Sequence, residues 1–380
     1  MRIVYLTDTR EIGGAERHLV DLAAGMVDAG HEVHLLAPQA DLVAYAAREA
    51  PGAHAARAFS DAYHDAPTPR RRVAALAAQL RRMAGAFRLI GPDVLHVNNG
   101  GWPGSDLLRL APLAARLAGV ERRIMTVHSN PWPREGRGQS VADQLVWRNT
   151  HVIVCPTRAV EAGLGERRGL PPGLAQLVHY GVNAPPGAEA APELRERLAS
   201  DGELVVGMVS ARPVAQKGYD VFLEALRATA APVRGVVVGR YPAGFEERAH
   251  EAGLGERLDL PGLRRDVGAY YHAFDVLTVP STGEECMPLV ILEAAAAGTP
   301  TFGSRLSGIP EAVDDGRSGR VFERGSGAAL AALLDEAAAD RRAVAEMGAE
   351  AERRWREKFT VERMLAEHER LYSGRDATQA

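Results

Sequence analysis

Cysteine and lysine are both scarce in this sequence of 380 residues. Its two cysteines, Cys155 and Cys286, are too few for a disulfide framework, so we expect a reduced, cytoplasmic protein. Only two of the 45 basic residues are lysines, Lys217 and Lys358, and the rest are arginines. In such a chain each lysine deserves separate consideration, because a compact ammonium group can fit where a planar guanidinium does not.

Three further absences narrow the possible functions. No apolar run approaches the roughly 18 residues of a membrane-spanning helix, and the first residues, MRIVYLTDTR, lack the basic-then-apolar order of a signal peptide. We therefore expect no leader and no stable insertion into a membrane. The formal net charge of -4 is close to balance, which argues against a nucleic-acid-binding protein. An Asp-x-Asp motif is also absent, so no metal held by that motif is expected.

Short apolar runs rich in β-branched residues alternate with long alanine-rich segments along the chain. Continuous apolar runs predict parallel strands that are covered on both faces, and the segments between them have the length of βα crossovers. The predicted strands span residues 2–7, 31–37, 93–98, 123–128, 151–157, 204–210, 234–239 and 275–281. Because a chain of this length exceeds one ordinary core, we expect an α/β protein with two doubly wound domains that divide within residues 183–192.

A glycine pair follows the first predicted strand. Gly13 and Gly14 lead into a helix predicted over residues 15–29, where the backbone can approach a ligand and the helix start offers N–H groups to an anion. A Gly-Gly pair in this place is also common as a simple turn, and the third glycine of the dinucleotide fingerprint is missing. Both interpretations remain open at this point.

Two cations follow the strand predicted at residues 204–210. Arg212 and Lys217 lie just beyond its end, with Gly218 next. Fixed positive charges there could hold a diphosphate and offset the charge that develops as it leaves. A surface loop with two cations is the alternative, but the scarcity of lysine favours a functional role for Lys217.

The segment from Asp275 to Gly298 carries the clearest pattern. A strand ends near Pro280, a loop follows, and Pro288 suits the first turn of a helix that ends at Gly298. The amides of Leu289 and Val290 would point out of the helix start, toward a phosphate or a sugar. Two carboxylates, Glu285 in the loop and Glu293 in the helix, could accept hydrogen bonds from sugar hydroxyls. Glu293 stands in an otherwise apolar stretch, where an unpaired carboxylate is costly.

Together, in this order and spacing, these motifs resemble those of the retaining glycosyltransferases of family four, which have the GT-B fold. The resemblance covers nearly the whole chain. The matching residues are Gly13-Gly14-Ala15-Glu16, Gly30-His31-Glu32-Val33, Arg212 with Lys217 and Gly218, Glu285 with Glu293, Ala297-Gly298-Thr299-Pro300, Gly308-Ile309-Pro310-Glu311, and Asp315-Gly316 with Gly319. Cys286 and Met287 depart from the pattern, because the family often has Gly and Phe there.

The resemblance implies a GT-B architecture of two Rossmann-like domains that face each other across a cleft. Residues 1–185 would form the acceptor-binding domain and residues 186–360 the donor-binding domain, with residues 361–380 returning to the first domain as a terminal helix. The implied donor is a nucleotide-diphosphate sugar, with UDP as the expected nucleotide, and no further cofactor is implied.

The resemblance also implies roles for single residues. Arg212 and Lys217 would bind the diphosphate, with Gly14 touching it from the first domain. Glu293 would bind the ribose, Glu285 the donor sugar, and the backbone near Leu263 and Arg264 the base; Pro288, Leu289 and Val290 would line the helix start. His128 matches a strand-end histidine near the reacting carbon, so His128, Arg212, Lys217 and Glu285 are the implied catalytic residues. The leaving diphosphate would help to deprotonate the acceptor on the same face of the sugar.

Polar and aromatic residues follow two strands of the first domain, where the acceptor would bind. They are Asn98, Asn99, Trp102, Ser129 and Asn130. Amides beside aromatic faces suit a sugar-like or cyclitol acceptor, such as an aminocyclitol or an intermediate of an envelope glycan. The expected activity is transfer of a hexose or N-acetylhexosamine to a hydroxyl group. A non-catalytic nucleotide-sugar-binding partner, or an epimerase or hydrolase of nucleotide sugars on the same fold, are the alternatives.

Arginines also gather on one predicted helix, at Arg70, Arg71, Arg72, Arg81 and Arg82. They could form a patch for an anionic acceptor or for an anionic membrane surface. A solvated helix face in an arginine-rich chain is the simpler interpretation.

Overall fold

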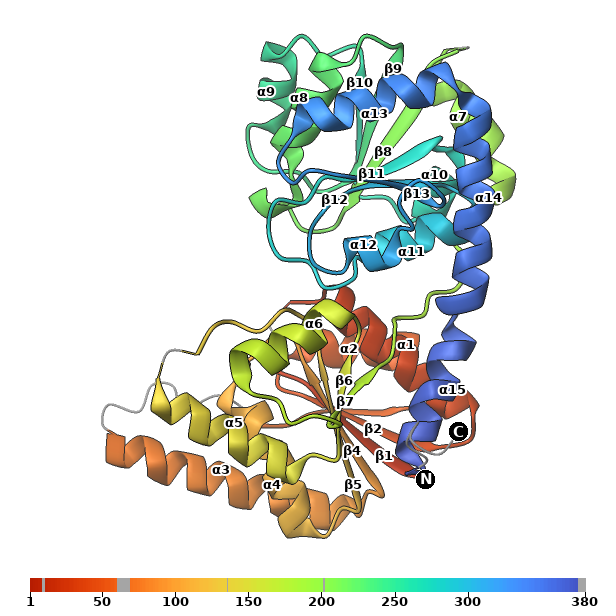
Figure 1. Ribbon diagram of the computed structural model, residues 1–380. Coiled ribbons are helices and arrows are strands. Elements are labelled where there is room, and N and C mark those ends of the chain that lie inside the picture. Colours follow the sequence, from red (N-terminus) through yellow and green to blue (C-terminus); the bar gives the residue numbers. More distant parts are fainter. Residues whose placement is uncertain (9–10, 60–68, 135, 201, 375–380) are drawn as a thin grey trace. The chain divides into compact units, whose positions relative to one another are not determined.

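The computed structural model describes residues 1–8, 11–59, 69–134, 136–200 and 202–374 (Figure 1). The chain forms two compact units. The first unit comprises Met1–His179 together with Val361–Ala380, and the second unit comprises Tyr180–Thr360. Each unit is built on one parallel sheet with helices packed against it, which confirms the predicted α/β class with two doubly wound sheets.

The first unit has a seven-stranded sheet in the order β3-β2-β1-β4-β5-β6-β7. All of its paired strands are parallel. The strands are β1 Arg2–Leu6, β2 Glu32–Ala37, β3 His54–Arg57, β4 Val94–Asn99, β5 Arg122–Val127, β6 Val152–Cys155 and β7 Ala175–Leu177. Strand order runs in one direction from β1 to β3 and in the other from β4 to β7, so the order reverses between β1 and β4.

Helices of the first unit include one from the far end of the chain. They are α1 Gly14–Asp28, α2 Ala40–Glu49, α3 Pro69–Ile90, α4 Asp106–Ala118, α5 Arg137–Asn149, α6 Arg158–Gly163 with the π-turn η1 Leu164–Arg168, and α15 Val361–Tyr372. Helix α15 packs against α1, where a Cβ on Gly25 would lie 2.4 Å from the Leu365 side chain. Its residues Val361, Met364, Leu371 and Tyr372 belong to the buried core of the first unit.

The second unit has a six-stranded parallel sheet in the order β10-β9-β8-β11-β12-β13. Its strands are β8 Leu204–Ser210, β9 Val233–Gly239, β10 Leu258–Gly262, β11 Val276–Val279, β12 Thr301–Ser304 and β13 Gly319–Phe322. Its helices are α7 Ala191–Leu198, α8 Tyr219–Ala228, α9 Phe245–Glu251, α10 Val267–Ala273, α11 Leu289–Ala296, α12 Ile309–Ala312, α13 Gly327–Ala339 and α14 Arg341–Lys358, with short 3-10 turns η2 Ala188–Ala190 and η3 Ala215–Lys217.

Strand β8 shows why the sequence forms a sheet that is covered on both faces. Successive residues of a strand point to opposite faces. Val205 belongs to one buried apolar cluster, whereas Leu204 and Val206 belong to another, and all three side chains are fully buried. Full burial of an aliphatic side chain contributes about 1.5–3 kcal/mol, so a run without polar residues is favoured here.

The strand order places two loops of the second unit at a topological switch point. Strands β8 and β11 are neighbours in the sheet. From β8 the following strands are added toward one edge of the sheet, to β10, and from β11 they are added toward the other edge, to β13. Open α/β sheets bind ligands at the carboxyl ends of strands on either side of such a reversal. The loops after β8 and β11 in the second unit, and those after β1 and β4 in the first unit, occupy this position.

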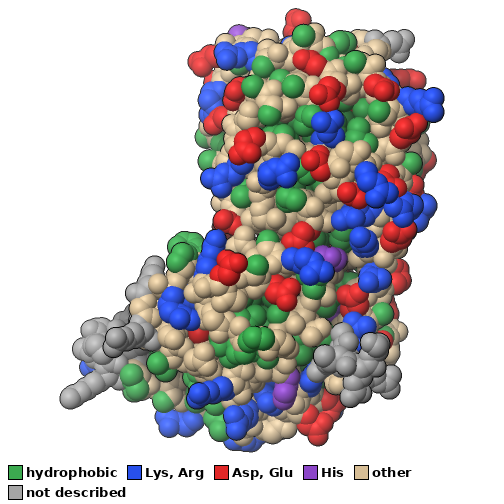
Figure 2. Space-filling model, in the orientation of Figure 1, with side chains coloured by type: hydrophobic (Ala, Val, Ile, Leu, Met, Phe, Trp, Pro, Cys, Tyr) green, Lys and Arg blue, Asp and Glu red, His purple; other side chains and the backbone are tan. Residues whose placement is uncertain are grey.

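Charged side chains of both signs are interspersed over the face of the molecule in Figure 2, as the net charge of -4 leads one to expect. In the part of the chain that the structure describes, no helix is both long and apolar enough to cross a membrane. Of the predicted arginine cluster, Arg71, Arg81 and Arg82 are exposed on α3, while the side chains of Arg70 and Arg72 lie outside the described residues.

Candidate functional site

The two loops at the switch point of the second unit are joined through their backbones. Amides of Thr282 and Gly283 donate to the carbonyl of Gln216 at 2.8 and 3.2 Å. Gly218 has a φ of +78°, and a Cβ at this position would lie 1.8 Å from the carbonyl oxygen of Pro280. Only glycine fits such a close approach in the left-handed region, so Gly218 fixes the loop after β8 against the end of β11.

Lys217 and Glu285, which belong to two separate sequence motifs, meet in the structure. Lys217 Nζ donates to Glu285 Oε1 at 2.6 Å, and the same oxygen accepts a hydrogen bond from Ser281 Oγ at 2.9 Å. The side chains are 26% and 11% exposed, so the pair is partly shielded from water but still reachable by a ligand. An ammonium group and a carboxylate are therefore held together at the carboxyl ends of β8 and β11.

Arg212 lies on the same loop as Lys217 and is exposed. Its carbonyl accepts hydrogen bonds from Ser210 Oγ at 3.0 Å and from the amide of Val214 at 2.9 Å, so the backbone of the loop is fixed on both sides of the residue. The structure thus places a second cation on the loop that carries Lys217.

Helix α11 begins at this edge of the sheet. Pro288 is its N-cap, with an extended ψ of 120°, and Leu289 is its first residue, so Pro288 lies just before the first turn in which the sequence predicts it. The first amides of a helix have no acceptor within the helix. Leu289 and Val290 therefore direct N–H groups out of the start of α11, which favours an anion there.

Glu293 lies in the second turn of α11 and is nearly buried, at 7% exposed. Tyr271, on α10, donates its hydroxyl hydrogen to Glu293 Oε2 at 2.6 Å. The tyrosine is itself held in place, since its carbonyl accepts a hydrogen bond from Thr299 Oγ1 at 2.7 Å. The cost of burying the Glu293 carboxylate is thereby reduced, and one of its oxygens is fixed in orientation.

Leu263 and Arg264 follow β10, whose carboxyl end lies at the same edge of the sheet. Both residues are exposed, and the Leu263 side chain is 59% accessible. Arg264 forms a two-pronged ion pair with Asp266 at 2.9 Å and lies 5.9 Å from the ring centre of Tyr270. The hydrogen bonds from Arg264 hold the pKa of Asp266 below its usual value. The loop is therefore anchored while its backbone remains accessible.

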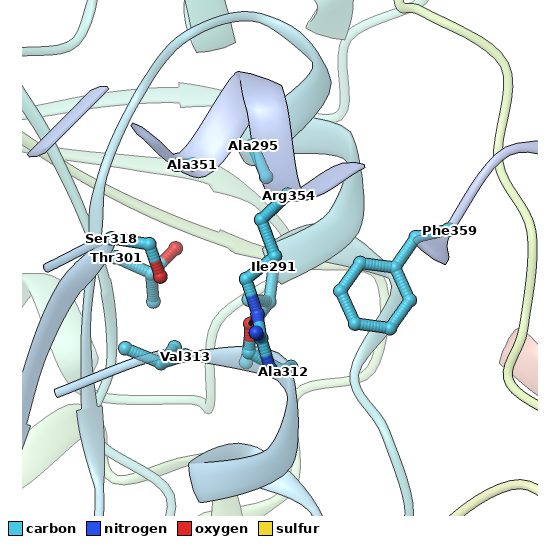
Figure 3. A pocket seen from close by; sticks show the side chains of 9 residues that line it. All are labelled: Ile291, Ala295, Thr301, Ala312, Val313, Ser318, Ala351, Arg354 and Phe359. Atoms are coloured by element: carbon cyan, nitrogen blue, oxygen red, sulfur yellow. Dashed lines mark hydrogen bonds between the residues drawn. The ribbon is translucent and has the colours of Figure 1, made fainter. Parts of the chain in front are cut away.

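A small cavity lies between α11, α12 and α14 (Figure 3). Arg354 of α14 reaches to α12, where Nη2 donates to the carbonyl of Glu311 at 2.6 Å and Nε to that of Ala312 at 3.3 Å. Helix α14 also approaches the end of α11 closely, since a Cβ on Gly348 would lie 2.2 Å from Gly298 O. The lining residues, shown in Figure 3, include none of the candidate donor residues, so we assign this cavity to the packing that supports α11.

In the first unit, the glycine pair forms the start of α1. Gly14 is the first helical residue and is exposed. The amide of Gly13 donates to Glu16 Oε2 at 2.9 Å, and Glu16 is buried. One amide of this helix start is therefore already occupied by a side chain of the helix, while the exposed Gly14 follows it.

His128 lies just beyond the end of β5 and is buried, at 6% exposed. Its Nε2 is 2.5 Å from Oδ1 of Asn98 on β4, so the amide oxygen accepts the ring hydrogen. Burial, together with the nearby His368, lowers the pKa of His128 to about 3. The imidazole is thus neutral near pH 7, and Asn98 holds its orientation.

Four buried histidines lie together in the first unit: His18 on α1, His96 on β4, His128 after β5, and His368 on α15. The ring centre of His18 lies 5.4 Å from that of His128 and 6.0 Å from that of His368. The ring of His96 stacks on that of His368, with the two ring centres 5.6 Å apart. His96 is fixed by Tyr372 at 2.6 Å and by Thr126 at 2.7 Å. Burial lowers the pKa of all four.

The expected acceptor residues divide into a buried and a more accessible group. Asn98, Asn99 and Trp102 are each only 1% exposed, whereas Ser129 and Asn130 are half-buried. Trp102 stacks on Trp147 with ring centres 4.4 Å apart. The indole of Trp102 is thus a core side chain, as buried as the side chains of Asn98 and Asn99.

A buried ion pair supports the segment that follows β5. Arg168 and Asp143 are both fully buried and meet at 2.9 Å, and Trp102 Nε1 also donates to Asp143 at 3.0 Å. The remaining Nη1 of Arg168 donates to the carbonyl of Trp132 at 3.3 Å and to Gln139 Oε1 at 2.9 Å. The buried Arg168 thus holds the backbone at Trp132, while the indole of Trp132 is 70% exposed.

Two family models match consecutive parts of the chain. The model described as Glycosyltransferase Family 4 matches residues 12–184, and the model described as Glycosyl transferases group 1 matches residues 203–340. This chain belongs to the family-four glycosyltransferases. The matched ranges include the Gly14 loop and His128 in the first unit and Arg212, Lys217, Glu285 and Glu293 in the second.

Curated relatives of this glycosyltransferase include two inositol-directed enzymes. The D-inositol 3-phosphate glycosyltransferase of Mycolicibacterium gilvum (strain PYR-GCK) is 29% identical over 264 residues, which are 64% of this chain and 58% of the relative. The phosphatidyl-myo-inositol mannosyltransferase of Mycobacterium leprae (strain TN) is 29% identical over 375 residues, covering 90% of this chain and 89% of the relative. The chain thus matches less than two thirds of the first relative's length.

Solved structures of similar fold cover almost the whole glycosyltransferase. HepE of Anabaena, in complex with UDP, has a TM-score of 0.83 at 20% identity and covers 98% of this chain and 100% of its own. Sucrose-phosphate synthase from Thermosynechococcus elongatus has a TM-score of 0.74 at 19% identity, and the match covers 98% of this chain and 99% of the synthase chain. These likenesses confirm the GT-B fold that the motifs predict.

Several partners of the candidate residues were not found from the sequence of this glycosyltransferase. They are Ser281, Tyr271, His18, His368, and the pair Asp143 and Arg168. The position of Ser281 at the end of a strand, four residues before Glu285, is a signal that could have found it. The others lie far along the chain from the residues they contact, and no local pattern marks them.

Proposed function

We propose that this glycosyltransferase transfers a hexose or N-acetylhexosamine from a UDP-sugar to a hydroxyl of a small-molecule or glycan acceptor, with retention of the anomeric configuration. The observation that carries the proposal is the contact of Lys217 with Glu285 at the switch point of the second unit, 2.6 Å long and partly shielded. In this contact, a cation that would bind the diphosphate lies beside a carboxylate that would bind the hydroxyls of the transferred sugar.

The donor would lie along the carboxyl ends of β8, β10 and β11. Arg212, Lys217 and the start of α11 at Leu289 and Val290 would neutralise the diphosphate, with Pro288 setting the entry to the helix. Glu293 would accept hydrogen bonds from the ribose hydroxyls. Backbone near Leu263 and Arg264 would bind the base, and Gly14 of the first unit would contribute backbone to the diphosphate. HepE, which has been solved with UDP and with UDP-glucose, supports the choice of UDP.

In the proposed reaction, the bond from the anomeric carbon to the diphosphate oxygen breaks, and the acceptor oxygen bonds to that carbon on the same face. The acceptor hydroxyl passes its proton to the departing diphosphate. Lys217 and Arg212 would stabilise the charge that develops on the diphosphate, since fixed cations aimed at developing charge lower the barrier. His128, neutral near pH 7, would contact the sugar close to the reacting carbon through hydrogen bonding rather than through charge.

The acceptor would bind on the first unit, beyond the ends of β4 and β5. Ser129 and Asn130 are accessible enough to contact it, while Asn98, Asn99 and Trp102 would shape the site from within the core. The names of the two curated relatives contain D-inositol 3-phosphate and phosphatidyl-myo-inositol, which supports a sugar-like or cyclitol acceptor for this chain. An aminocyclitol and an intermediate of an envelope glycan share the required hydroxyl groups.

Incubation of the protein with a panel of nucleotide sugars and of cyclitol and glycan acceptors tests the proposal. We expect a glycoside by mass spectrometry, formed most rapidly from a UDP-sugar, and an anomeric configuration by NMR that matches the donor. Breakdown or isomerisation of the donor without a glycoside would contradict transfer. Absence of nucleotide release with every donor and acceptor would favour a non-catalytic binding protein.

The contact of Tyr271 with Glu293 gives a prediction about donor affinity. Tyr271→Phe should raise KM for the donor about tenfold with a smaller change in kcat, because loss of a hydrogen bond to a buried carboxylate costs about 1–3 kcal/mol. Steady-state kinetics with the donor varied would measure both constants.

Tyr270→Phe is the matched control, because it removes a hydroxyl group from the neighbouring residue on α10 and keeps the ring. Tyr270 is 4% exposed, and the guanidinium of Arg264 lies over its ring, 5.9 Å from the ring centre. The assignment of Glu293 to the ribose would be contradicted if the two variants changed KM equally.

A further inference from the structure

An edge of the first unit carries a cluster of possible metal ligands outside the candidate site. Strand β3 is the edge strand of the sheet and pairs with β2. In this pairing His34 stands directly opposite His54. Glu32 precedes His34 by two residues on the same strand, and therefore points to the same face of the sheet. Two adjacent strands thus present two imidazoles and a carboxylate together.

The three side chains are close enough to share one ion. The rings of His34 and His54 have their centres 4.9 Å apart, and His34 Nε2 lies 2.9 Å from Glu32 Oε1. One ligand atom from each residue lies within 4.8 Å of the others. Ligand atoms around a tetrahedral Zn²⁺ are about 3.3 Å apart, given bonds of about 2.0–2.1 Å, so small side-chain rotations would complete the site. We propose that Glu32, His34 and His54 bind Zn²⁺ or a similar transition-metal dication.

The surroundings of Glu32 fit this role. Arg2 Nε contacts Glu32 Oε1 at 2.8 Å and is anchored by its Nη1 hydrogen bond to the carbonyl of Ile90 at 2.8 Å. Arg2 would keep Oε1 while Oε2 binds the metal, which is the outer support that ligating carboxylates commonly have. The Glu32 side chain is 42% exposed, which leaves access for water as the fourth ligand.

The donor set selects the class of metal. Two imidazole nitrogens and one carboxylate suit Zn²⁺ and its neighbours, whereas Ca²⁺ and Mg²⁺ prefer sites made wholly of oxygen. Both strands carry these residues toward their amino ends, while the candidate catalytic residues follow the carboxyl ends of strands. The metal would therefore join β3, a strand of only four residues, to β2, and its binding does not depend on the proposed transfer reaction.

Titration of the untagged, chelator-treated full chain with ZnCl₂ by calorimetry tests the site. We expect one Zn²⁺ per chain, a rise in Tm, and intense visible absorption when Co²⁺ replaces Zn²⁺ in four-coordinate geometry. His34→Ala and His54→Ala should each weaken binding by roughly 100-fold or more, because even outer-shell substitutions weaken metal sites by 10- to 100-fold. His250→Ala, which removes an exposed histidine from α9 of the second unit, should leave binding unchanged.

Three outcomes would overturn the proposal. They are the absence of zinc binding to the unsubstituted chain, binding that persists in both His34→Ala and His54→Ala, and Mg²⁺ binding as tight as that of Zn²⁺. Circular dichroism of each variant separates loss of a ligand from loss of the fold. The exposed position of His54 makes its variant the more reliable of the two, since little packing is removed.

Discussion

Replacement of Lys217 by alanine should lower the rate of sugar transfer by about 100- to 1,000-fold, which is the usual effect of removing one group that stabilises developing charge. Lys217 is the cation in direct contact with Glu285, and in the proposed reaction it faces the departing diphosphate. Its removal would also leave Glu285 without its charged partner beside the same phosphate groups. The loss should appear mainly in kcat, because the charge on the diphosphate grows as the bond breaks.

Lys358→Ala is the matched control, since it removes the other lysine of the chain. Lys358 is exposed at the end of α14 and should affect transfer little. Lys217→Arg extends the comparison: a guanidinium is larger and planar, so we expect only partial recovery of the rate. Small and equal effects of Lys217→Ala and Lys358→Ala on kcat/KM would refute the role of Lys217.

Lowering the pH from 7 to 5 should destabilise the first unit by several kcal/mol through its four buried histidines. Burial, with the neighbouring His368, holds the pKa of His128 at about 3, and burial holds that of His368 at about 4, against 6.5 for an unperturbed histidine. Between pH 6.5 and these values the unfolded chain binds protons that the folded chain does not, so stability falls as the pH falls. At pH 5 the loss is about 2 kcal/mol for each of these two residues.

His18 and His96 act in the same direction, because burial also lowers the pKa of both. Unfolding by urea at pH 7 and pH 5 would measure the effect. Three of the four tryptophans, Trp102, Trp132 and Trp147, belong to the first unit, so indole fluorescence reports mainly on that unit.

His368→Gln should reduce the loss of stability between pH 7 and pH 5, because one buried imidazole is removed. His250→Ala should leave that loss unchanged, since His250 is exposed in the second unit. The comparison uses the difference between two pH values for each variant, so a general destabilisation by His368→Gln does not obscure it. An equal free energy of unfolding at both pH values in the unsubstituted protein would contradict the explanation.

The sequence predicted the central strands within a few residues, because each is a continuous apolar run. It missed β3, β7, β10, β12 and β13. These strands have three to five residues, and some contain polar side chains, as in HAAR for β3 and TFGS for β12. Their formation depends on pairing with a neighbouring strand from elsewhere in the chain, and local composition does not record that pairing.

The candidate site shows the same division between local and distant information. Motif spacing selected Lys217 and Glu285, although 68 residues separate them, because each follows a recognisable strand. The positions of Tyr271 and His368 depend on how helices pack, which the motifs do not specify. The burial of Trp102 could not be predicted for a related reason, because its partner Asp143 lies 41 residues away in the sequence.

The place of α15 in the first unit has a consequence for synthesis of the chain. Residues 361–372 supply part of the buried core around β1 and β4, including Tyr372, whose hydroxyl lies 3.0 Å from that of Tyr5. During translation the ribosome makes the whole second unit before it reaches these residues. The second unit, which is continuous in the sequence, can therefore complete its core first. The first unit can complete its core only after α15 has emerged from the ribosome.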